Sequence, residues 1–409
     1  MNRKAQGNRN RYAQAIGGAA AVSALLAAAA CSSSGSSSSA SSGASSSSAS
    51  AAATAATPAT STPATQASGN SALQQLQAKV NATLKAPTGI GLSTPLSAKP
   101  GAGKSIVSLL TPLAVALTES NAQAQAAKML GWSYRTVQEG TGPQDPEQAL
   151  NAAIVLRPSG IIYYGTPRSS MASGLQKAQQ ADIPVVATAQ TDPLAAPIIA
   201  DNSNSGPQLS KLGSAVADYV AVNSDLKASV ALVTLPAYPV LASFDGGFTH
   251  ELSSVCSGCT VTQLPQQLTD IGTNTPSSVV NAIRRNPSIK YVIFDTGSVA
   301  TGVEAALKSA GLTDVVVGGE SPDSDAIAQM KAGGNQAWAA LSIPIAGFQL
   351  MDALARHFDG DSLAPVVQET PPWQILTSAN IGRAALDGQG NYVGYAGYQA
   401  AFAKLWNVG

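Results

Sequence analysis

Two closely spaced cysteines are the first groups in this chain that could carry chemistry. Cys256 and Cys259 are separated by two residues, a spacing that fits a short disulfide, a redox-active thiol pair or half of a zinc site. A redox pair would begin a helix in a thioredoxin-like context, and zinc would need further ligands, of which only His250 lies near in the sequence. The pair therefore favours a local structural disulfide, with free thiols and catalytic or metal roles as the alternatives.

A second segment resembles part of a phosphate-binding loop. It reads Gly-Ala-Gly-Lys-Ser over residues 101–105, but the full motif needs a glycine where Ala98 stands. The segment also follows a proline-bearing stretch and precedes an apolar, strand-like run, whereas a phosphate loop follows a strand and opens a helix. We interpret it as a polar lead-in to a strand. The chain has two histidines and no serine-nucleophile or zinc-protease motif, so an enzyme, a metal site and a cofactor are not expected.

The third group is the thiol of Cys31. Four basic residues precede an uncharged, alanine-rich run over 13–30, and a Ser/Ala/Thr-rich tract follows the cysteine. A basic start, a short apolar run and small residues at the cleavage point are typical of an export signal. The arrangement resembles a bacterial lipoprotein precursor, cleaved before Cys31 and lipidated on its sulfur, although Ala28 stands where such signals usually carry Leu, Val or Ile. An ordinary secretion signal and a weak membrane span are the alternatives.

Composition limits the rest of the chain. Residues 31–70 are too polar and small to bury a core, so we expect a disordered tether after a signal peptide at 1–30. Removing the four basic residues of the signal from 23 leaves 19 against 23 acidic residues, a net charge of −4. This charge does not favour nucleic-acid binding. The roughly 340 remaining residues exceed one comfortable core and predict two domains.

From residue 105 onward, strand-like and helix-like segments alternate. The expected strands span 105–110, 134–137, 160–164, 183–186, 230–235, 260–263, 290–294 and 314–317, and the expected helices span 114–130, 145 onward, 169–181, 208–222, 244–254, 276–285 and 301–310. This alternation predicts an α/β fold with two doubly wound parallel-sheet lobes and a ligand cleft between them. Asp145 is the expected N-cap of its helix, with Pro146 in the first turn.

Several segments in this order resemble the type I periplasmic binding proteins, close to the ribose-binding group of ABC importers. The segments that carry the resemblance are 126–132, 158–162, 181–186, 201–202, 246–248, 316–320 and 347–352, and the similarity covers about 104–370. The resemblance implies a solute-binding lipoprotein that delivers a small neutral ligand, sugar-like or less polar, to a membrane permease. An extracytoplasmic sensor that presents its ligand to a membrane receptor is the alternative.

The resemblance also implies how the chain divides. We expect a lead-in at 71–103, a first lobe from 104–202 plus 344–370, and a second lobe from 203–343 with part of the tail 371–409. The chain would cross between lobes near 201–202, near 342–343 and near 371–373, and few crossings permit hinge closure around a ligand. The protein would act as a monomer at the outer face of the membrane.

Candidate ligand residues come from positions that hold the sugar in ribose binders. Glu320 stands at an Asp position and is the one charged group that remains, while Ala189 and Ala242 replace charged residues. The implied ligand-binding residues are Thr111, Leu113, Gln190, Tyr238, Thr296, Glu320, Ser342 and Trp373. Two alternatives stay open: Glu320 could cap a helix that begins near Pro322, and Trp373 could belong to the core. With fewer paired polar groups, the site does not favour a pentose.

The lipid anchor gives a first prediction. Cys31→Ser removes the sulfur that would be acylated, so the protein should appear in the medium or accumulate unprocessed. Fractionation of cells and mass spectrometry of the mature protein measure this. A variant that matures normally and stays with the membrane would show that Cys31 is not the anchor.

Overall fold

The computed structural model describes residues 64–202, 206–368 and 370–409, with the side chains of 64–70 and 202 left aside. Cys31, the predicted signal peptide and most of the predicted tether lie outside these ranges. The helices are α1 (Ala64–Thr83), α2 (Ala114–Leu130), α3 (Asp145–Val155), α4 (Ala172–Gln180), α5 (Gly206–Asn223), α6 (Leu241–Val255), α7 (Asn274–Arg285), α8 (Val303–Ser309), α9 (Ser324–Lys331), α10 (Ile343–Asp359), α11 (Ala364–Gln368) and α12 (Tyr398–Leu405). Short 3₁₀ turns include η1 (Arg168–Met171) and η3 (Gly297–Ala300).

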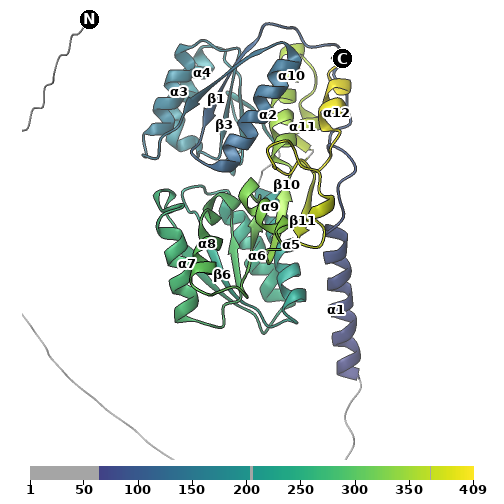
Figure 1. Ribbon diagram of the computed structural model, residues 1–409. Helices are drawn as coiled ribbons and strands as arrows, with labels where there is room; N and C mark the ends of the chain where they lie inside the picture. The colour runs from purple at the N-terminus through teal and green to yellow at the C-terminus, as the bar shows by residue number, and fades with distance from the viewer. Residues whose placement is uncertain (1–63, 203–205, 369) are drawn as a thin grey trace, which may run out of the picture. The chain divides into compact units, whose positions relative to one another are not determined.

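The strands form two separate sheets (Figure 1). They are β1 (Ser105–Leu110), β2 (Ser133–Gln138), β3 (Gly160–Tyr164), β4 (Val185–Thr188), β5 (Ile198–Asn202), β6 (Ser229–Thr234), β7 (Thr260–Pro265), β8 (Tyr291–Phe294), β9 (Val316–Glu320), β10 (Gln336–Leu341) and β11 (Trp373–Thr377). The first sheet has the order β2-β1-β3-β4-β5 and the second β11-β10-β9-β8-β6-β7. All pairs are parallel except β10 with β11. The predicted doubly wound, two-lobe α/β architecture is confirmed.

Strand alternation explains how lobe 1, the lobe of the first sheet, is built. Ile106 points to the face covered by α2 and α10, while its neighbour Val107 packs with α3 and α4 on the other face. The same division holds for Ile162 and Ile161 on β3. Because successive side chains of a strand point to opposite faces, a continuous apolar strand needs helices on both sides.

In lobe 2, the lobe of the second sheet, helices α5 and α6 pack closely side by side. Glycines make this possible: a Cβ atom on Gly213 of α5 would lie 2.2 Å from the Phe244 carbonyl oxygen of α6, and one on Gly247 would lie 2.1 Å from the Ser210 carbonyl oxygen. The two backbones therefore touch where the side chains are missing. Helices α7 and α8 contact each other, and Figure 1 shows them on the opposite side of this sheet.

The chain passes between the two sheets at three places. Strand β5 ends at Asn202 and α5 begins at Gly206, while β10 ends at Leu341 and α10 begins at Ile343. Strand β11 then begins at Trp373. No helix in the part of the chain that the structure describes has the length and apolar content to cross a bilayer.

The C-terminal tail is shared by both lobes. Strand β11 joins the lobe 2 sheet, whereas α12 packs on α10 of lobe 1, with the Trp406 ring stacked 5.6 Å from that of Phe348. The Trp406 indole nitrogen donates to Asp352 at 2.7 Å, and Arg356 pairs with the same carboxylate at 2.6 Å. The sequence placed part of the tail in lobe 2, and the structure adds that its last helix belongs to lobe 1.

Two local expectations differ from the structure. Helix α1 begins at Ala64, inside the range predicted as a disordered tether. It is stabilised by contact with α5: Leu76 and Val80 are buried, and Lys79 lies 3.5 Å from Asp218. The second difference is at α3, where Gln144 is the N-cap and Asp145 is the first helical residue; the Asp145 carboxylate instead accepts from the Gly142 nitrogen.

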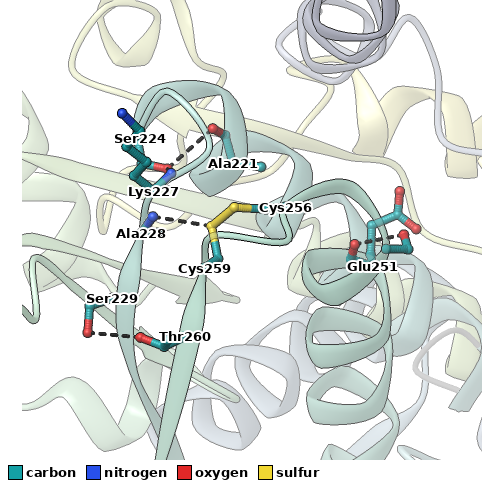
Figure 2. Close-up of a disulfide and its surroundings, with 10 residues drawn as sticks. Ala221, Ser224, Lys227, Ala228, Ser229, Glu251, Cys256, Cys259 and Thr260 are labelled. Atoms are coloured by element: carbon teal, nitrogen blue, oxygen red, sulfur yellow. Dashed lines mark hydrogen bonds between the residues drawn. A yellow bond between two sulfur atoms is a disulfide. The ribbon is translucent and has the colours of Figure 1, made fainter. Parts of the chain in front are cut away.

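Cys256 and Cys259 are joined by a disulfide between α6 and β7 (Figure 2). Cys256 is buried, and the Cys259 sulfur accepts a hydrogen bond from the Ala228 nitrogen at 3.2 Å. Beside it, the Thr260 hydroxyl donates to the Ser229 hydroxyl between β7 and β6. The disulfide therefore fixes the turn that delivers the chain from α6 into the edge strand β7.

The close approach of α5 and α6 generates a second prediction. In Gly213→Ala the new methyl group meets backbone, which cannot move aside as a side chain can, so we expect a loss of about 1–3 kcal/mol in unfolding free energy. Gly246→Ala is the matched control, because its Cβ atom would meet nothing within 4 Å. That change should be neutral or stabilise α6 by up to about 1 kcal/mol. Urea unfolding measures both, and equal stabilities would contradict the packing described.

Candidate functional site

The candidate site lies where the carboxyl ends of the strands in the two sheets come together. In lobe 1, the residues that follow β1, β2, β3 and β4 carry a hydrogen-bonded polar chain. The Thr111 hydroxyl donates to the Glu139 carboxylate at 2.8 Å, and the Thr166 hydroxyl donates to it at 3.3 Å. The Gln190 amide then donates to the Thr166 carbonyl at 3.0 Å. All four residues are buried, so this edge is a fixed polar surface.

In lobe 2, polar residues follow β8 and β9. Asp295 is fully buried, and one of its carboxylate oxygens accepts from the Leu235 nitrogen at 2.6 Å, while the other has no partner among the described residues. The hydroxyl of the next residue, Thr296, is buried and likewise unpartnered. Glu320 is buried and accepts from the Ser321 hydroxyl. These groups have lost water without gaining full protein partners, which is costly unless something else binds them.

Two residues at these strand ends have a strained backbone conformation. Ala189 directly follows β4 and Ser321 directly follows β9, and both have positive φ values, 59° and 47°. Residues other than glycine rarely adopt this region, and such strain tends to collect at ligand-binding positions. The strain here lies at one strand end in each lobe.

The two edges touch each other in the described structure. The Val115 nitrogen of lobe 1 donates to the Ser298 hydroxyl of lobe 2 at 3.3 Å. Tyr238 of lobe 2 lies so close to Gly165 of lobe 1 that a Cβ atom there would be 3.0 Å from its ring. Leu113 packs into the hydrophobic core of lobe 2. The centre of the cleft is therefore closed.

Two cavities flank this contact. The larger, about 610 Å³, lies beside the first crossing and is lined by Gln190, Asp201 and Ser210 among others, with α6 contributing Ser243 and Gly247. This volume is in the range of small-molecule sites. The smaller, about 20 Å³, lies beside Ser321 and is bordered by the tail residues Asn391 and Tyr392. A space of this size can hold about one water molecule, for which roughly 10–15 Å³ suffices.

Burial controls the electrostatics of this region. It raises the pKa of Glu320 to about 8, and the pKa values of Asp201 and Asp245 to about 7. Burial also raises the pKa of Asp295 well above its ordinary range, and the nearby carboxylates of Asp245 and Glu320 raise it further. The pKa of Glu139 is raised by burial too, against the opposing effect of its hydroxyl donors. Carboxylic acids therefore gather at this edge without a cation to balance them.

The eight predicted ligand residues lie in different parts of the structure. Thr111, Gln190, Thr296 and Glu320 lie at strand carboxyl ends, and Leu113 and Tyr238 lie at the lobe contact, as the preceding contacts show. The Ser342 hydroxyl donates to the Val393 carbonyl of the tail at 2.7 Å. Trp373 begins β11 with the Lys211 ammonium 5.8 Å from its ring centre. Of the eight predicted residues, Gln190 alone is among those lining the two cavities.

The alternative role of Glu320 as a helix cap is wrong. Helix α9 begins at Ser324, and its N-cap is Asp323, whose carboxylate accepts from the Ala326 nitrogen at 2.8 Å. Glu320 ends β9 instead, with its side chain buried at the sheet edge. Helix capping therefore does not explain why the Glu320 side chain is buried.

Sequence reasoning missed Glu139, Thr166, Asp295 and Asp201. One signal could have found the first three: each is a polar residue that directly follows, or lies two residues after, a strand of a sheet predicted to be parallel. Asp201 lies within β5, a strand that the alternation did not predict. Among the described residues, no group of three or more His, Cys, Asp or Glu side chains is arranged to hold a metal ion.

Comparison with known proteins identifies the class. The family model described as periplasmic binding protein domain matches residues 118–362, and the chain belongs to this family. No curated protein matches the chain. The family and the similar structures are binding proteins, which favours binding over catalysis.

Solved structures with the same fold include ABC-transporter proteins. An ABC sugar transporter subunit from Rhodobacter sphaeroides 2.4.1 has 19% identity and a TM-score of 0.58, covering 68% of this chain and 99% of that one. A solute-binding protein from Agrobacterium vitis bound with α-D-tagatopyranose has 18% identity and a TM-score of 0.60, with 71% and 99% covered. One from Burkholderia graminis C4D1M in complex with D-arabinose has 17% identity and a TM-score of 0.59, with 70% and 99% covered. At these identities the likeness establishes the fold.

The raised pKa of Glu320 generates a third prediction. Its ordinary value is 4.5 and its value in the fold is about 8. Between these values the folded protein keeps a proton that the unfolded chain has lost, so stability is present at low pH and is lost as pH rises. Glu320→Gln has no such proton, so from about pH 5 to about pH 8 its melting temperature should fall less than that of the wild type.

The exposed Asp325 of α9 provides the control for this measurement. Asp325→Asn should follow the wild-type pH profile. Parallel profiles for the wild type and Glu320→Gln would mean that folding does not change the proton affinity of Glu320.

Proposed function

We propose that this chain is the monomeric substrate-binding protein of an ABC importer, held at the outer face of the cell membrane by lipid on Cys31. It captures a small solute, sugar-like or less polar, between its lobes and presents it to a membrane permease. The main support is the meeting of two polar strand edges at a cleft with a cavity of about 610 Å³ beside the first crossing. The sugar ligands of the structural neighbours support the class of ligand.

The closed centre of the cleft indicates how a ligand would enter. The lobes touch through Tyr238 and Gly165, so a solute reaches Glu139 or Glu320 only after the lobes separate. Few chain segments cross between the lobes, and such a connection allows hinge motion. Closing around a solute would then exchange lobe–lobe contacts for contacts with the ligand.

The charge of the cleft limits the ligand further. Asp192 and Asp201 line the larger cavity, and Glu139 and Glu320 are buried at the two edges. A carboxylate or phosphate on the ligand would find no buried basic side chain to pair with at these edges in the described part of the chain, and its charge would oppose ionisation of the carboxyl groups around it. The sequence predicts a neutral solute. This proposal keeps the part of that prediction that excludes an acidic group on the solute.

The test is a thermal-shift screen of sugars, alditols, amino sugars and other small metabolites, followed by calorimetry. A solute that binds only the folded protein raises its melting temperature. Stabilisation by at least one compound supports the proposal. A screen in which no compound stabilises the protein would count against solute binding.

Glu320→Ala is the variant that follows from this proposal. Its carboxylate would accept hydrogen bonds from the ligand, and losing them should weaken binding about ten- to hundredfold. Asp325→Ala, on the exposed side of α9, should bind as the wild type does. Unchanged affinity in Glu320→Ala with a lowered melting temperature would remove Glu320 from the site.

A further inference from the structure

The carboxylate of Asp295 is buried in lobe 2 and only partly hydrogen-bonded. The side chain has no solvent-exposed surface, and one of its two oxygens has no partner among the described residues. Its other oxygen is held by the Leu235 nitrogen, which follows β6. Asp295 itself follows β8, so it lies at the sheet edge where Ser298 meets lobe 1. A buried carboxylate oxygen with a free acceptor position needs a donor.

The other ionisable groups that face Asp295 are acidic. Strands β8 and β9 are paired with Phe294 opposite Gly319, so Asp295 and Glu320, the next residue of each strand, are neighbours at the sheet edge. Asp245 of α6 has an unpartnered oxygen and, like Glu320, disfavours the ionised form of Asp295. Glu320 accepts from the Ser321 hydroxyl. Ionising these carboxyl groups together is unfavourable, because like charges repel and burial removes their water.

No basic side chain in the described part of the chain compensates for them. Arg356 is the one buried basic residue there, and it is paired with Asp352 on α10 of lobe 1. The neighbouring groups that act on Asp295 and Glu320 include no lysine, arginine or histidine. Asp295, Glu320 and Asp245 thus offer hydrogen-bond acceptors, and a balancing positive charge would have to come from the ligand.

We infer that the ligand carries an ammonium group, which binds between Asp295 and Glu320. This inference rests on the proposed solute-binding function and names its ligand class: small amine-bearing, sugar-like solutes such as amino sugars. An ammonium has three donors and no acceptor, so it can satisfy the free oxygens of Asp295 and Asp245 at once. Its bonds to carboxylates are charge-assisted, roughly twice as strong as neutral hydrogen bonds.

A hydroxyl group would serve these acceptors less well. It has one donor and brings two lone pairs of its own into a place already crowded with oxygen atoms. The unpartnered Thr296 hydroxyl beside Asp295 can accept as well as donate, so it can receive a further ammonium hydrogen. The remaining hydroxyls of the ligand would meet neutral donors such as Gln190 in lobe 1.

The experiment compares matched pairs that differ at the amine. Calorimetry on the full mature chain measures D-glucosamine against D-glucose, D-galactosamine against D-galactose, and D-glucosamine against N-acetyl-D-glucosamine. We expect the amine to bind at least about tenfold more tightly than its neutral partner in at least one pair. Calcium chloride and magnesium chloride are measured alongside to detect a metal ion at the carboxylates.

Asp295→Asn removes the charge and keeps the oxygen that accepts from Leu235. In this variant the preference for the amine over its neutral partner should fall to about threefold or less. The exposed Asp325→Asn is the control and should keep the full preference. Melting curves establish that each variant is folded, and Glu320→Gln repeats the test if Asp295→Asn does not fold.

The outcomes separate this inference from the proposed function. Tighter binding of an amine that depends on Asp295 supports both. Neutral sugars that bind as tightly as their amines, or a metal salt that stabilises the protein when amines do not, would overturn the ammonium site and leave solute binding intact. If the broad screen finds ligands but no amine among them, the inference fails alone; if it finds no ligand at all, the proposed function fails with it.

Discussion

Parallel hydrogen bonding within each sheet is the constraint on which the rest of this structure depends. Strands that run in one direction end at one edge, so every residue that follows a strand is delivered to the same side of its lobe. In lobe 1, Thr166 contacts both Glu139 and Gln190 in this way, although the three residues follow different strands and lie far apart in the chain. The two edges come into contact where the Val115 nitrogen donates to the Ser298 hydroxyl.

The polar groups at these edges reduce stability where binding is expected. Asp295, Thr296 and Glu320 are removed from water and are only partly hydrogen-bonded, whereas the apolar strand centres are fully packed. The strained backbone of Ala189 and Ser321 also lowers the stability of the folded protein. A ligand that supplies the missing donors would return this free energy on binding, so the same groups that weaken the empty protein would strengthen the complex.

The tail gives the lobes a connection that the family match does not include, since that match ends at residue 362. Strand β11 is fixed to β10, and α12 is fixed to α10 by the Trp406–Asp352 hydrogen bond. Between them, the Val393 carbonyl accepts from Ser342 at the second crossing. The Ser342 hydroxyl therefore joins the start of α10 to the tail segment between β11 and α12.

The sequence by itself determined the alternation of strands and helices, and with it the two-lobe fold. Apolar runs such as 105–110 and 160–164 are buried on both faces, and local composition carries that signal strongly. Positions at strand ends, such as Thr111 and Glu320, could also be chosen, because parallel topology fixes where they go. Helix α1 and strands β5, β10 and β11 were missed, since their stability comes from long-range partners rather than local pattern.

Only the tertiary structure decided which polar groups are paired. Whether Glu320 caps a helix or lies buried at a sheet edge depends on where α9 begins, and Asp323 takes the cap. Whether Asp295 has a balancing cation depends on which side chains fold around it, and the groups found there are Asp245 and Glu320. Burial and pairing are properties of residues far apart in the sequence, and no local spacing encodes them.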